Sequence, residues 1–571
     1  MKIIKNIFPV FIVLILSFFS IKPLLMSGFF PIHDDTQVAR VYEMGKALSD
    51  SMFPVRWVED LGFGYGYPIF NFYAPLSYYF GSIFNLIGFD ALIATKIMMG
   101  FGIILTGVFM YFFAKELFGD IGGIVAALFY MYAPYHGVDI YVRGDVAEFW
   151  AYAFIPLVFY SLWKVYKNSN WIFLIIVSLG YAGVILSHNL TAMMATPFLL
   201  FYILFLSVIS YKQKRRNTIF YLLLGLIFGA LISSFYWLPA LSEMKYTNVL
   251  SQIGGGANFL DHFVCLPQLW LSPWGYGGSA PGCVDGLSFM IGKLHILVSI
   301  IVFILTMILL VRKRNKENIE KLLIIILFFL GFALSIILTL DISKSLWQAV
   351  PLMAFFQYPW RFLLMISFFA SILAGSFVWI ISLFIAKMNN KNLYLYCLGA
   401  FLVVVSLLLN SKFFAAQTIL NNDSSYYTND TALEWSISKI SHEYMPKNFL
   451  IPKNLSEIST GVIKIESGNL KIIKLEKTTQ SYKVVVNALT PSSILIPIAN
   501  FPSWSLSIDG RKASFIARNS GIEVAVSSGV HAVSLNFSQT PIEKFSNLVS
   551  LAGIGMLLIG IILSGKKHYG K

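Results

Sequence analysis

Long apolar stretches alternate with short polar segments along most of the chain. An α-helix needs about 17 to 25 mainly apolar residues to cross the hydrocarbon core of a bilayer. Eleven stretches meet or approach this length, and a shorter one at 121–134 would cross only with local thinning of the bilayer. The pattern therefore predicts about twelve transmembrane helices. The eleven longer stretches cover residues 7–26, 91–113, 149–165, 171–186, 190–210, 219–238, 296–311, 322–340, 362–386, 393–409 and 548–563.

Residues 69–88 are apolar enough to suggest a thirteenth helix, although they contain the polar or helix-breaking residues Asn71, Pro75, Ser77 and Asn85. Cytoplasmic loops of membrane proteins carry an excess of lysine and arginine, and this excess tests the count. If 69–88 lies along the interface, all the basic loops face the cytoplasm, whereas a full crossing turns them all outward. We therefore predict an interfacial or re-entrant segment, with Tyr73, Tyr78 and Tyr79 at the lipid headgroups. The basic residues are Lys164, Lys167, Lys212, Lys214, Arg215, Arg216, Arg312, Lys313, Arg314, Lys316, Lys321, Lys387, Lys391, Lys566, Lys567 and Lys571.

The first apolar stretch follows Lys2 and Lys5, as a secretory signal would, but it lacks a small-residue cleavage site and ends in a Lys-Pro pair. It is interpreted as a retained first helix, which places both termini of this cell-membrane protein in the cytoplasm. The domains expected are a multi-helix transmembrane domain at 1–410, with a first outer loop at 31–90, and an extracytoplasmic β-rich domain at 411–545. A terminal helix and a basic cytoplasmic tail then occupy 546–571.

The block at 411–545 is the only stretch large enough for a soluble domain. From residue 461 onward it consists of short alternating segments separated by turn signals such as Asp509-Gly510 and Ser528-Gly529. This pattern predicts a small β-sandwich on the outer face of the membrane. The predicted strands cover 462–465, 470–475, 481–487, 494–498, 505–508, 523–526 and 532–537.

Composition agrees with a chain that lies largely in lipid. Hydrophobic residues make up 57% of it, and charged residues only 12%, against roughly a quarter in soluble proteins. The net charge of +14 does not indicate nucleic-acid binding, because the basic residues fall in short clusters and form no contiguous face. Of three cysteines, Cys265 and Cys283 share an outer loop, where their pairing is left open, and Cys397 lies in an apolar helix. Their spacing is unlike that of a zinc site.

Two acidic motifs lie at the predicted outer ends of early helices. The first is His33-Asp34-Asp35. One of the two repelling aspartates can act as a general base, or the pair can hold a divalent cation. Alternatively, one aspartate simply caps the helix that follows.

The second motif is Arg143-Gly144-Asp145-Val146-Ala147-Glu148. Its two acids lie three residues apart and share one face if a helix begins there, and the arginine supplies a cation beside them. The alternative is again a capped helix start, which explains the acids better than it explains the arginine. Because both motifs are expected on the same side of the membrane, we assign Asp34, Asp35, Asp145 and Glu148 as candidate catalytic residues.

Other polar residues on that side suit an anionic, lipid-linked substrate. Arg361 can bind a phosphate, while Trp360 can stack on a sugar or belong to the aromatic belt. Lys96 can reach the same anion or only lipid headgroups. His188 can reach the cavity, although a lone histidine is more often structural. With His33 and Arg143, these residues form the predicted substrate-binding set. Aromatic residues between 57 and 73 are a further, weaker sign of sugar binding.

Several segments resemble a prokaryotic membrane-protein family labelled 6-pyruvoyl-tetrahydropterin synthase-related. They are HDDTQVARVYEMGKAL, FPVRWVEDLGFGYGYPIFNFYAPLSYY, YVRGDVAEFWA, FFQYPWRFL and NFPSWSLSIDGRKA. The label does not imply pterin chemistry, because pterin synthases bind zinc through three clustered histidines and the eight histidines here are scattered.

More distantly, the architecture is similar to the glycosyltransferase C superfamily, called GT-C. The resemblance implies transfer of a sugar from a polyprenyl-phosphate donor to a glycan or protein acceptor outside the cytoplasm. It implies Asp34 or Asp35 as the first-loop acid and Asp145 or Glu148 as the second-loop acid. His-Asp-Asp stands here in place of the commoner Asp-Glu or Glu-Asp pair, which leaves the choice of base open.

Two other functions are kept as alternatives. One is a transporter or flippase for lipid-linked glycans, which usually carries ionisable groups at the membrane midplane and repeated halves, neither of which is seen in this sequence. The other is a non-catalytic scaffold whose outer β-sandwich binds partners and whose acids only cap helices.

Overall fold

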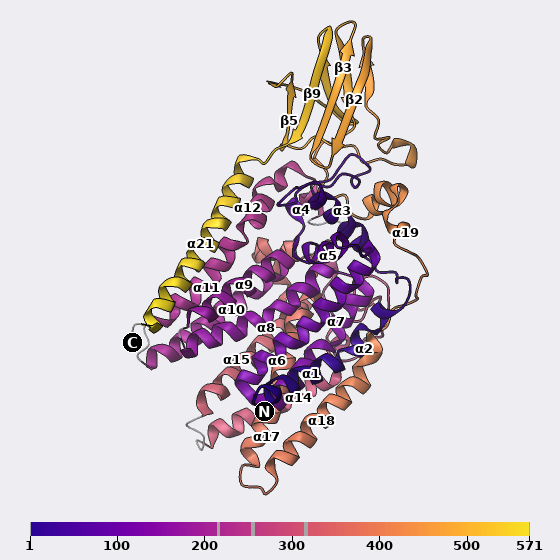
Figure 1. The fold of residues 1–571 in the computed structure, drawn as a ribbon. Helices are drawn as coiled ribbons and strands as arrows, with labels where there is room; N and C mark the ends of the chain where they lie inside the picture. Colours follow the sequence, from indigo (N-terminus) through magenta and orange to yellow (C-terminus); the bar gives the residue numbers. More distant parts are fainter. Residues whose placement is uncertain (1, 169, 214–216, 253–256, 313–317, 570–571) are drawn as a thin grey trace.

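The computed structural model describes residues 2–168, 170–213, 217–252, 257–312 and 318–569. It forms a long body of roughly parallel helices with a β-rich domain at one end (Figure 1). Helix α1 (Lys2–Leu16) begins, and α21 (Pro541–Tyr569) ends, at the opposite end of the body (Figure 1). The side of the membrane on which the β-rich domain lies remains a prediction from charge. Of the basic residues used for it, Lys214, Arg215, Arg216, Lys313, Arg314, Lys316 and Lys571 lie outside the described residues.

Within the described residues, nine helical stretches are long and apolar enough to cross a membrane, or ten if one bent pair forms a single span. They are Ile7–Leu25 (α1, α2 and η1), α6 (Ala91–Met131), α8 (Val146–Asn168), α10 (Asn189–Lys212), α14 (Lys293–Val311), α15 (Ile319–Thr339), Pro359–Phe384 (η10 and α17), α18 (Lys391–Asn410) and α21. The bent pair is α11 (Thr218–Ile232) with α12 (Ser234–Glu243), which meet at 66°. A multi-pass helical membrane protein is therefore confirmed.

Every one of the twelve predicted stretches is helical, but the count differs for three reasons. The two stretches at 91–113 and 121–134 join into the 41 residues of α6, which break their helical geometry only at Gly119, where φ is 83°. Helix α9 (Trp171–Ser187) is shorter than a full span. The third difference is the bend between α11 and α12.

Residues 69–88 form two short helices, α4 (Ile69–Phe72) and α5 (Leu76–Leu86), and neither is a candidate span. Their length agrees with the prediction that this segment does not cross the bilayer. Two of its tyrosines have hydrogen-bond partners within the protein. Tyr78 is fully buried and donates a hydrogen bond to Gln37 at 2.7 Å, and Tyr79 accepts one from the Val55 amide at 2.8 Å. These phenols find polar partners inside the protein because α5 packs between α3 (Gln37–Ser49) and α6.

The β-rich domain contains two antiparallel sheets, with strand orders β1-β4-β8-β7 and β2-β3-β9-β5-β6. All seven predicted strands are present, so the C-terminal β domain is confirmed. Two edge strands were not predicted, because three residues are too few to show an alternating pattern. The strands are β1 (Lys464–Ser467), β2 (Leu470–Thr478), β3 (Ser481–Ala488), β4 (Ser492–Ile496), β5 (Trp504–Ile508), β6 (Arg511–Ala513), β7 (Ile516–Arg518), β8 (Gly521–Val526) and β9 (Gly529–Phe537).

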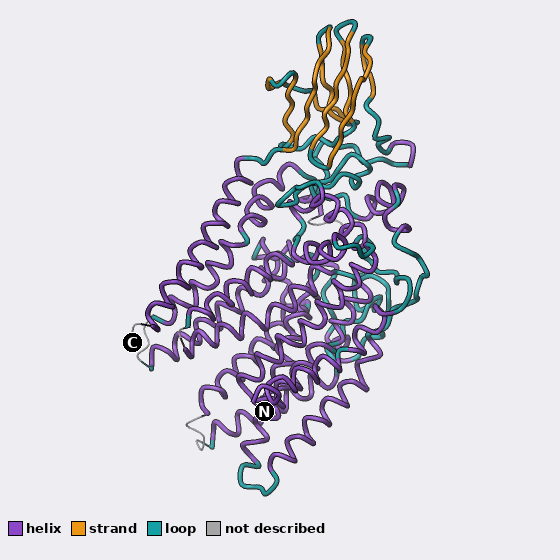
Figure 2. The backbone as a smooth tube through the Cα atoms, in the orientation of Figure 1, coloured by secondary structure: helices purple, strands orange, loops and turns teal. Residues whose placement is uncertain are grey.

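Loops join the two parts of the molecule, and Figure 2 shows them gathered between the strands and the helices. Trp57 of the first loop is 1% exposed and packs against Trp504 and Phe537 of the β domain, with ring centroids 5.5 Å apart in both pairs. The Thr479 amide and hydroxyl donate to Asp50, which follows α3, at 2.6 and 2.7 Å. Most of the first-loop aromatic side chains are thus buried in the core, and several pack against the C-terminal part of the chain. They do not form an exposed surface for sugar binding.

Candidate active site

The two acidic motifs meet through backbone hydrogen bonds. The amides of His33 and Asp34 donate to the carbonyls of Val142 and Arg143 at 3.0 and 2.9 Å. The Gln37 side chain donates to the Gly144 carbonyl at 2.8 Å. Gly144 has a φ of 67°, and a Cβ there would lie 2.4 Å from Ile32, so glycine allows this close approach. The loop that precedes α3 and the loop that precedes α8 are therefore joined beside the acids.

Arg143 lies at the centre of a buried cluster of charges. It ends a π-helical turn, η2 (Asp139–Arg143), just before α8. Its guanidinium contacts Asp139 at 2.6 Å, Asp145 at 2.7 Å and Glu148 at 3.0 Å. It also donates to the Tyr135 hydroxyl, which in turn donates to Glu148. A buried charge needs this degree of pairing, so most of the Arg143 donors are already used.

Arg361 approaches the same carboxylates from the 3-10 turn η10 (Pro359–Phe362) but is less completely paired. Its Nε lies 3.6 Å from Glu148, and its Nη2 lies 4.0 Å from Asp145. Its Nε and Nη1 are buried without a hydrogen-bond partner among the described residues. Such donors are costly to leave unpaired. Gln357, a non-glycine residue with a φ of 63°, turns the chain just before this segment.

The carboxylates differ in their electrostatic surroundings. Burial, reinforced by the charge of Asp145, raises the pKa of Asp34 from 3.8 to about 6 against the opposing charges of three arginines. Burial raises the pKa of Asp35 to about 6. Burial alone would also raise the pKa of Asp145, but nearby cations, above all Arg143, outweigh it and lower this pKa to about 2. Neither Asp34 nor Asp35 has a side-chain hydrogen bond within the described ranges.

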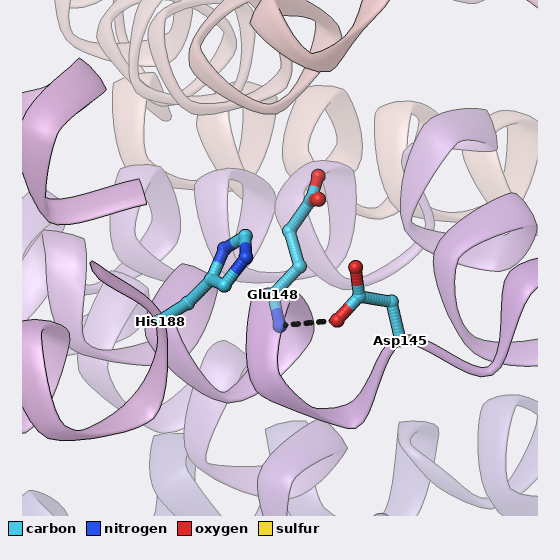
Figure 3. Close-up of side chains that lie close together, drawn as sticks. All are labelled: Asp145, Glu148 and His188. Atoms are coloured by element: carbon cyan, nitrogen blue, oxygen red, sulfur yellow. Dashed lines mark hydrogen bonds between the residues drawn. The ribbon is translucent and has the colours of Figure 1, made fainter. Parts of the chain in front are cut away.

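His188 joins the cluster from the short connection between α9 and α10. Figure 3 shows its ring beside the Glu148 side chain, with Asp145 accepting the Glu148 backbone amide. One ligand atom from each of these three residues lies within 4.8 Å of the others, a spacing that a metal ion can bridge. However, the same two carboxylates already contact Arg143 at 2.7 and 3.0 Å. Because a second cation would be repelled by the arginines, the trio fits a metal poorly.

A disulfide-closed loop lies over the cluster. Cys265 and Cys283, whose pairing the sequence left open, form a disulfide. Within this loop, Ser279 accepts a hydrogen bond from the Trp360 indole at 3.1 Å, and the Tyr276 carbonyl contacts His33 Nε2 at 2.9 Å. The Trp360 ring lies 4.9 Å from the Arg143 guanidinium, in a cation–π contact.

The structure thus brings seven of the ten predicted site residues into contact with one another or with the two joined loops, and it places His188 within 4.8 Å of Asp145 and Glu148. Asp35 follows Asp34 and is half-buried. Lys96 donates to the Met26 carbonyl at 2.7 Å, and no contact within the described residues links it to the cluster. Asp139 and Tyr135 were not predicted. Asp139 stands four residues before Arg143, a helical spacing that signals the ion pair.

Comparison with known families identifies the larger part of the helical domain. A family model described as "6-pyruvoyl-tetrahydropterin synthase related domain; membrane protein" matches residues 70–416, which is more than half of the chain. The chain belongs to this family. The match confirms the resemblance seen in the sequence segments and the membrane character of the protein. The matched region contains Arg143, Asp145, Glu148, His188 and Arg361.

Two further similarities are more limited. An uncharacterized protein of Lactococcus lactis subsp. cremoris (strain MG1363) is 25% identical over 213 residues, which cover 36% of this chain. The chain spans about a third of that relative, 35% of its length. The crystal structure of ArnT from Cupriavidus metallidurans bound to undecaprenyl phosphate is 12% identical and covers 72% of this chain and 89% of ArnT, with a TM-score of 0.29. A score this low does not establish a common fold.

Proposed function

We propose that this protein is a membrane glycosyltransferase of the GT-C kind, which transfers a sugar from a polyprenyl-phosphate donor to an extracytoplasmic acceptor. The observation that carries the proposal is Arg361, whose buried Nε and Nη1 lack hydrogen-bond partners within the described chain while Asp34 nearby has an unpaired carboxylate. An arginine with free donors suits a phosphate, and a free carboxylate suits proton abstraction. A transferase needs both groups at one site.

In the proposed reaction, Asp34 takes the proton from an acceptor hydroxyl group. The acceptor oxygen forms a bond to the anomeric carbon of the sugar as the bond from that carbon to the phosphate oxygen breaks. The phosphate keeps the electron pair and leaves as polyprenyl phosphate, and Arg361 stabilises the negative charge that develops on it. A single displacement of this kind inverts the anomeric centre.

The remaining residues have supporting roles in this proposal. Asp145 and Glu148 hold the two arginines in place, and Arg143 links them to Asp139. Trp360 offers a face for the sugar. His33 and His188 lie at the edges of the cluster, where they can donate to sugar hydroxyls. Asp35, with a pKa also raised to about 6, is the alternative base. Lys96, which is half-exposed, is assigned to membrane lipid.

The test compares Asp34→Asn and Arg361→Gln with Asp341→Asn, a matched control because Asp341 is an exposed acid in another predicted outer loop. We expect all three variants to insert normally in cells that depend on this protein. The first two should remove a surface glycan and lower transfer in reconstituted vesicles, by about 10²–10⁴-fold for the base and about 10²–10³-fold for the arginine.

Two outcomes would contradict the proposal. If both variants insert normally and leave the surface glycans unchanged, the acids are structural. If vesicles containing the wild-type protein move a labelled lipid-linked sugar across the bilayer without transferring it, the protein is a transporter.

A further inference from the structure

A cavity lies where the β domain meets the start of α21. Its volume is about 570 Å³, within the about 300–1,000 Å³ of typical small-molecule sites. The walls come from the end of α12, from strands β5 and β6, and from residues 538–542. None of the residues of the Arg143 cluster lines it. It is therefore a separate candidate site, on the side of the helical body where the β domain lies.

One part of this wall is held rigidly by a buried polar network. Glu243 accepts a hydrogen bond from the Thr540 hydroxyl at 2.6 Å and another from Asn71 at 2.7 Å. Arg56 donates to the same Asn71 at 2.7 Å and lies 4.0 Å from the buried Glu543. Both Glu243 oxygens are thus occupied, and this carboxylate is not free to bind a cation.

The remaining lining combines aromatic rings with free positive charge. Tyr246 and Phe515 contribute accessible rings to the wall, whereas Trp504, which also lines it, is 4% exposed and packs on Trp57 and Phe537. Lys245 and Lys512 line it with exposed side chains and form no ion pair within the described ranges, and the Lys245 ammonium lies 5.1 Å from the Tyr246 ring. The Trp504 indole nitrogen is buried and has no acceptor among the described residues. Aromatic faces bind the apolar face of a sugar ring, while unpaired lysines attract an anion.

We propose that this cavity binds a saccharide that carries a carboxylate or phosphate group. The sugar ring packs on Tyr246 and Phe515, and its acidic group lies between Lys245 and Lys512. A simple anion site would not need the two accessible rings, and a neutral-sugar site would not need two lysines that have no acidic partner among the described residues. This site does not depend on the proposed transfer reaction, because it shares no residue with the acid and arginine cluster.

The test measures binding to the full-length protein in detergent by saturation-transfer NMR. The probes are a glucuronate-containing disaccharide, the neutral disaccharide cellobiose and inorganic phosphate. We expect the acidic disaccharide to bind most tightly. Lys245→Ala and Lys512→Ala should each weaken it about tenfold, the effect of losing one charged hydrogen bond. Lys483→Ala, at an exposed position on β3, should change nothing. Both lysines are exposed, and unchanged melting curves would show that the variants are folded.

Several results would overturn the inference. Equal binding of cellobiose, or lysine variants that bind as the wild type does, would exclude recognition of the acidic group. Phosphate that binds as tightly as the disaccharide would reduce the cavity to an anion site. Phosphatidylglycerol vesicles that displace the disaccharide competitively would identify a lipid headgroup as the occupant. Each of these results is independent of whether Asp34→Asn abolishes transfer.

Discussion

Arg143 and Arg361 contact the same carboxylates, but different fractions of their donors are already used. Arg143 has three carboxylates within 3.0 Å, whereas Arg361 approaches no closer than 3.6 Å and keeps two unpaired nitrogens. The first arrangement stabilises the fold, since it neutralises buried negative charge. The second leaves donors available to a ligand. Two arginines of one cluster are therefore expected to respond differently to substitution.

Arg143→Gln should destabilise the protein by about 3–5 kcal/mol, because it leaves several buried carboxylates without their cation. Arg361→Gln should change the melting temperature little while transfer falls. Thermal melts of the purified full-length variants, measured beside the transfer assay, separate the two effects. A loss of stability for Arg361→Gln equal to that for Arg143→Gln would contradict this division of roles.

The raised pKa of Asp34 gives two pH dependences of opposite sign. A base must be deprotonated, so transfer should rise as the pH increases through about 6. The folded protein holds this proton more tightly than the unfolded chain, so the contribution of Asp34 to stability should decline as the pH rises from about 4 to about 6.

Comparing the melting curves of wild type and Asp34→Asn across this range isolates the stability effect of Asp34. Asp35→Asn serves as the comparison, because its pKa is also raised to about 6. If the transfer rate still rises near pH 6 in Asp34→Asn but no longer does so in Asp35→Asn, Asp35 is the base.

Metal chelation should leave transfer unchanged. Asp145 and Glu148 already hold Arg143, so a divalent ion would have to displace an arginine to bind with His188. EDTA treatment of the purified protein, followed by the transfer assay, tests this. Loss of activity that Mg²⁺ or Mn²⁺ restores would show that the trio holds a metal after all.

At the scale of elements, the disulfide-closed loop contacts two residues of the site, Trp360 and His33. Its Ser279 holds the Trp360 indole, and Trp360 covers the Arg143 guanidinium. Replacing both Cys265 and Cys283 with serine should loosen this loop and raise the KM for the donor more than it lowers kcat. Cys397→Ser, at an exposed free cysteine, is the control. Unchanged kinetics in the double variant would show that the loop does not position Trp360.

Most of the aromatic residues of the first loop are buried, which the sequence did not reveal. Its aromatic residues were candidates for sugar binding, yet Trp57, Tyr67 and Phe70 are at most 2% exposed. Trp57 packs on Trp504 and Phe537 of the β domain, far along the chain, and Tyr67 packs on Tyr444, whereas Phe70 packs on Tyr78 of the same loop. Burial by a remote segment is not visible in local periodicity. By contrast, the strands of the β domain were predictable, since their alternation is local.

For the whole molecule, the topology prediction concerns which end faces the cytoplasm. In a Cys397→Ser background, Ser528→Cys marks the β8–β9 turn and Lys387→Cys marks a basic connection between α17 and α18; both positions are exposed. A membrane-impermeant maleimide applied to intact cells should label the first and not the second. The disulfide-bonded Cys265 and Cys283 do not react. The opposite labelling pattern would invert the topology.

The sequence by itself determined the membrane class, most of the helices and the presence of a β domain. These depend on the length and period of apolar runs, which are local properties. It also selected both acidic motifs. Only the tertiary structure decided that the Asp34 amide bonds to the Arg143 carbonyl and that Arg361 reaches Glu148 from more than two hundred residues away. It also decided that two buried Arg361 nitrogens have no hydrogen-bond partner among the described residues. Contacts of this kind depend on how the helices pack, because residues distant in sequence share one buried site.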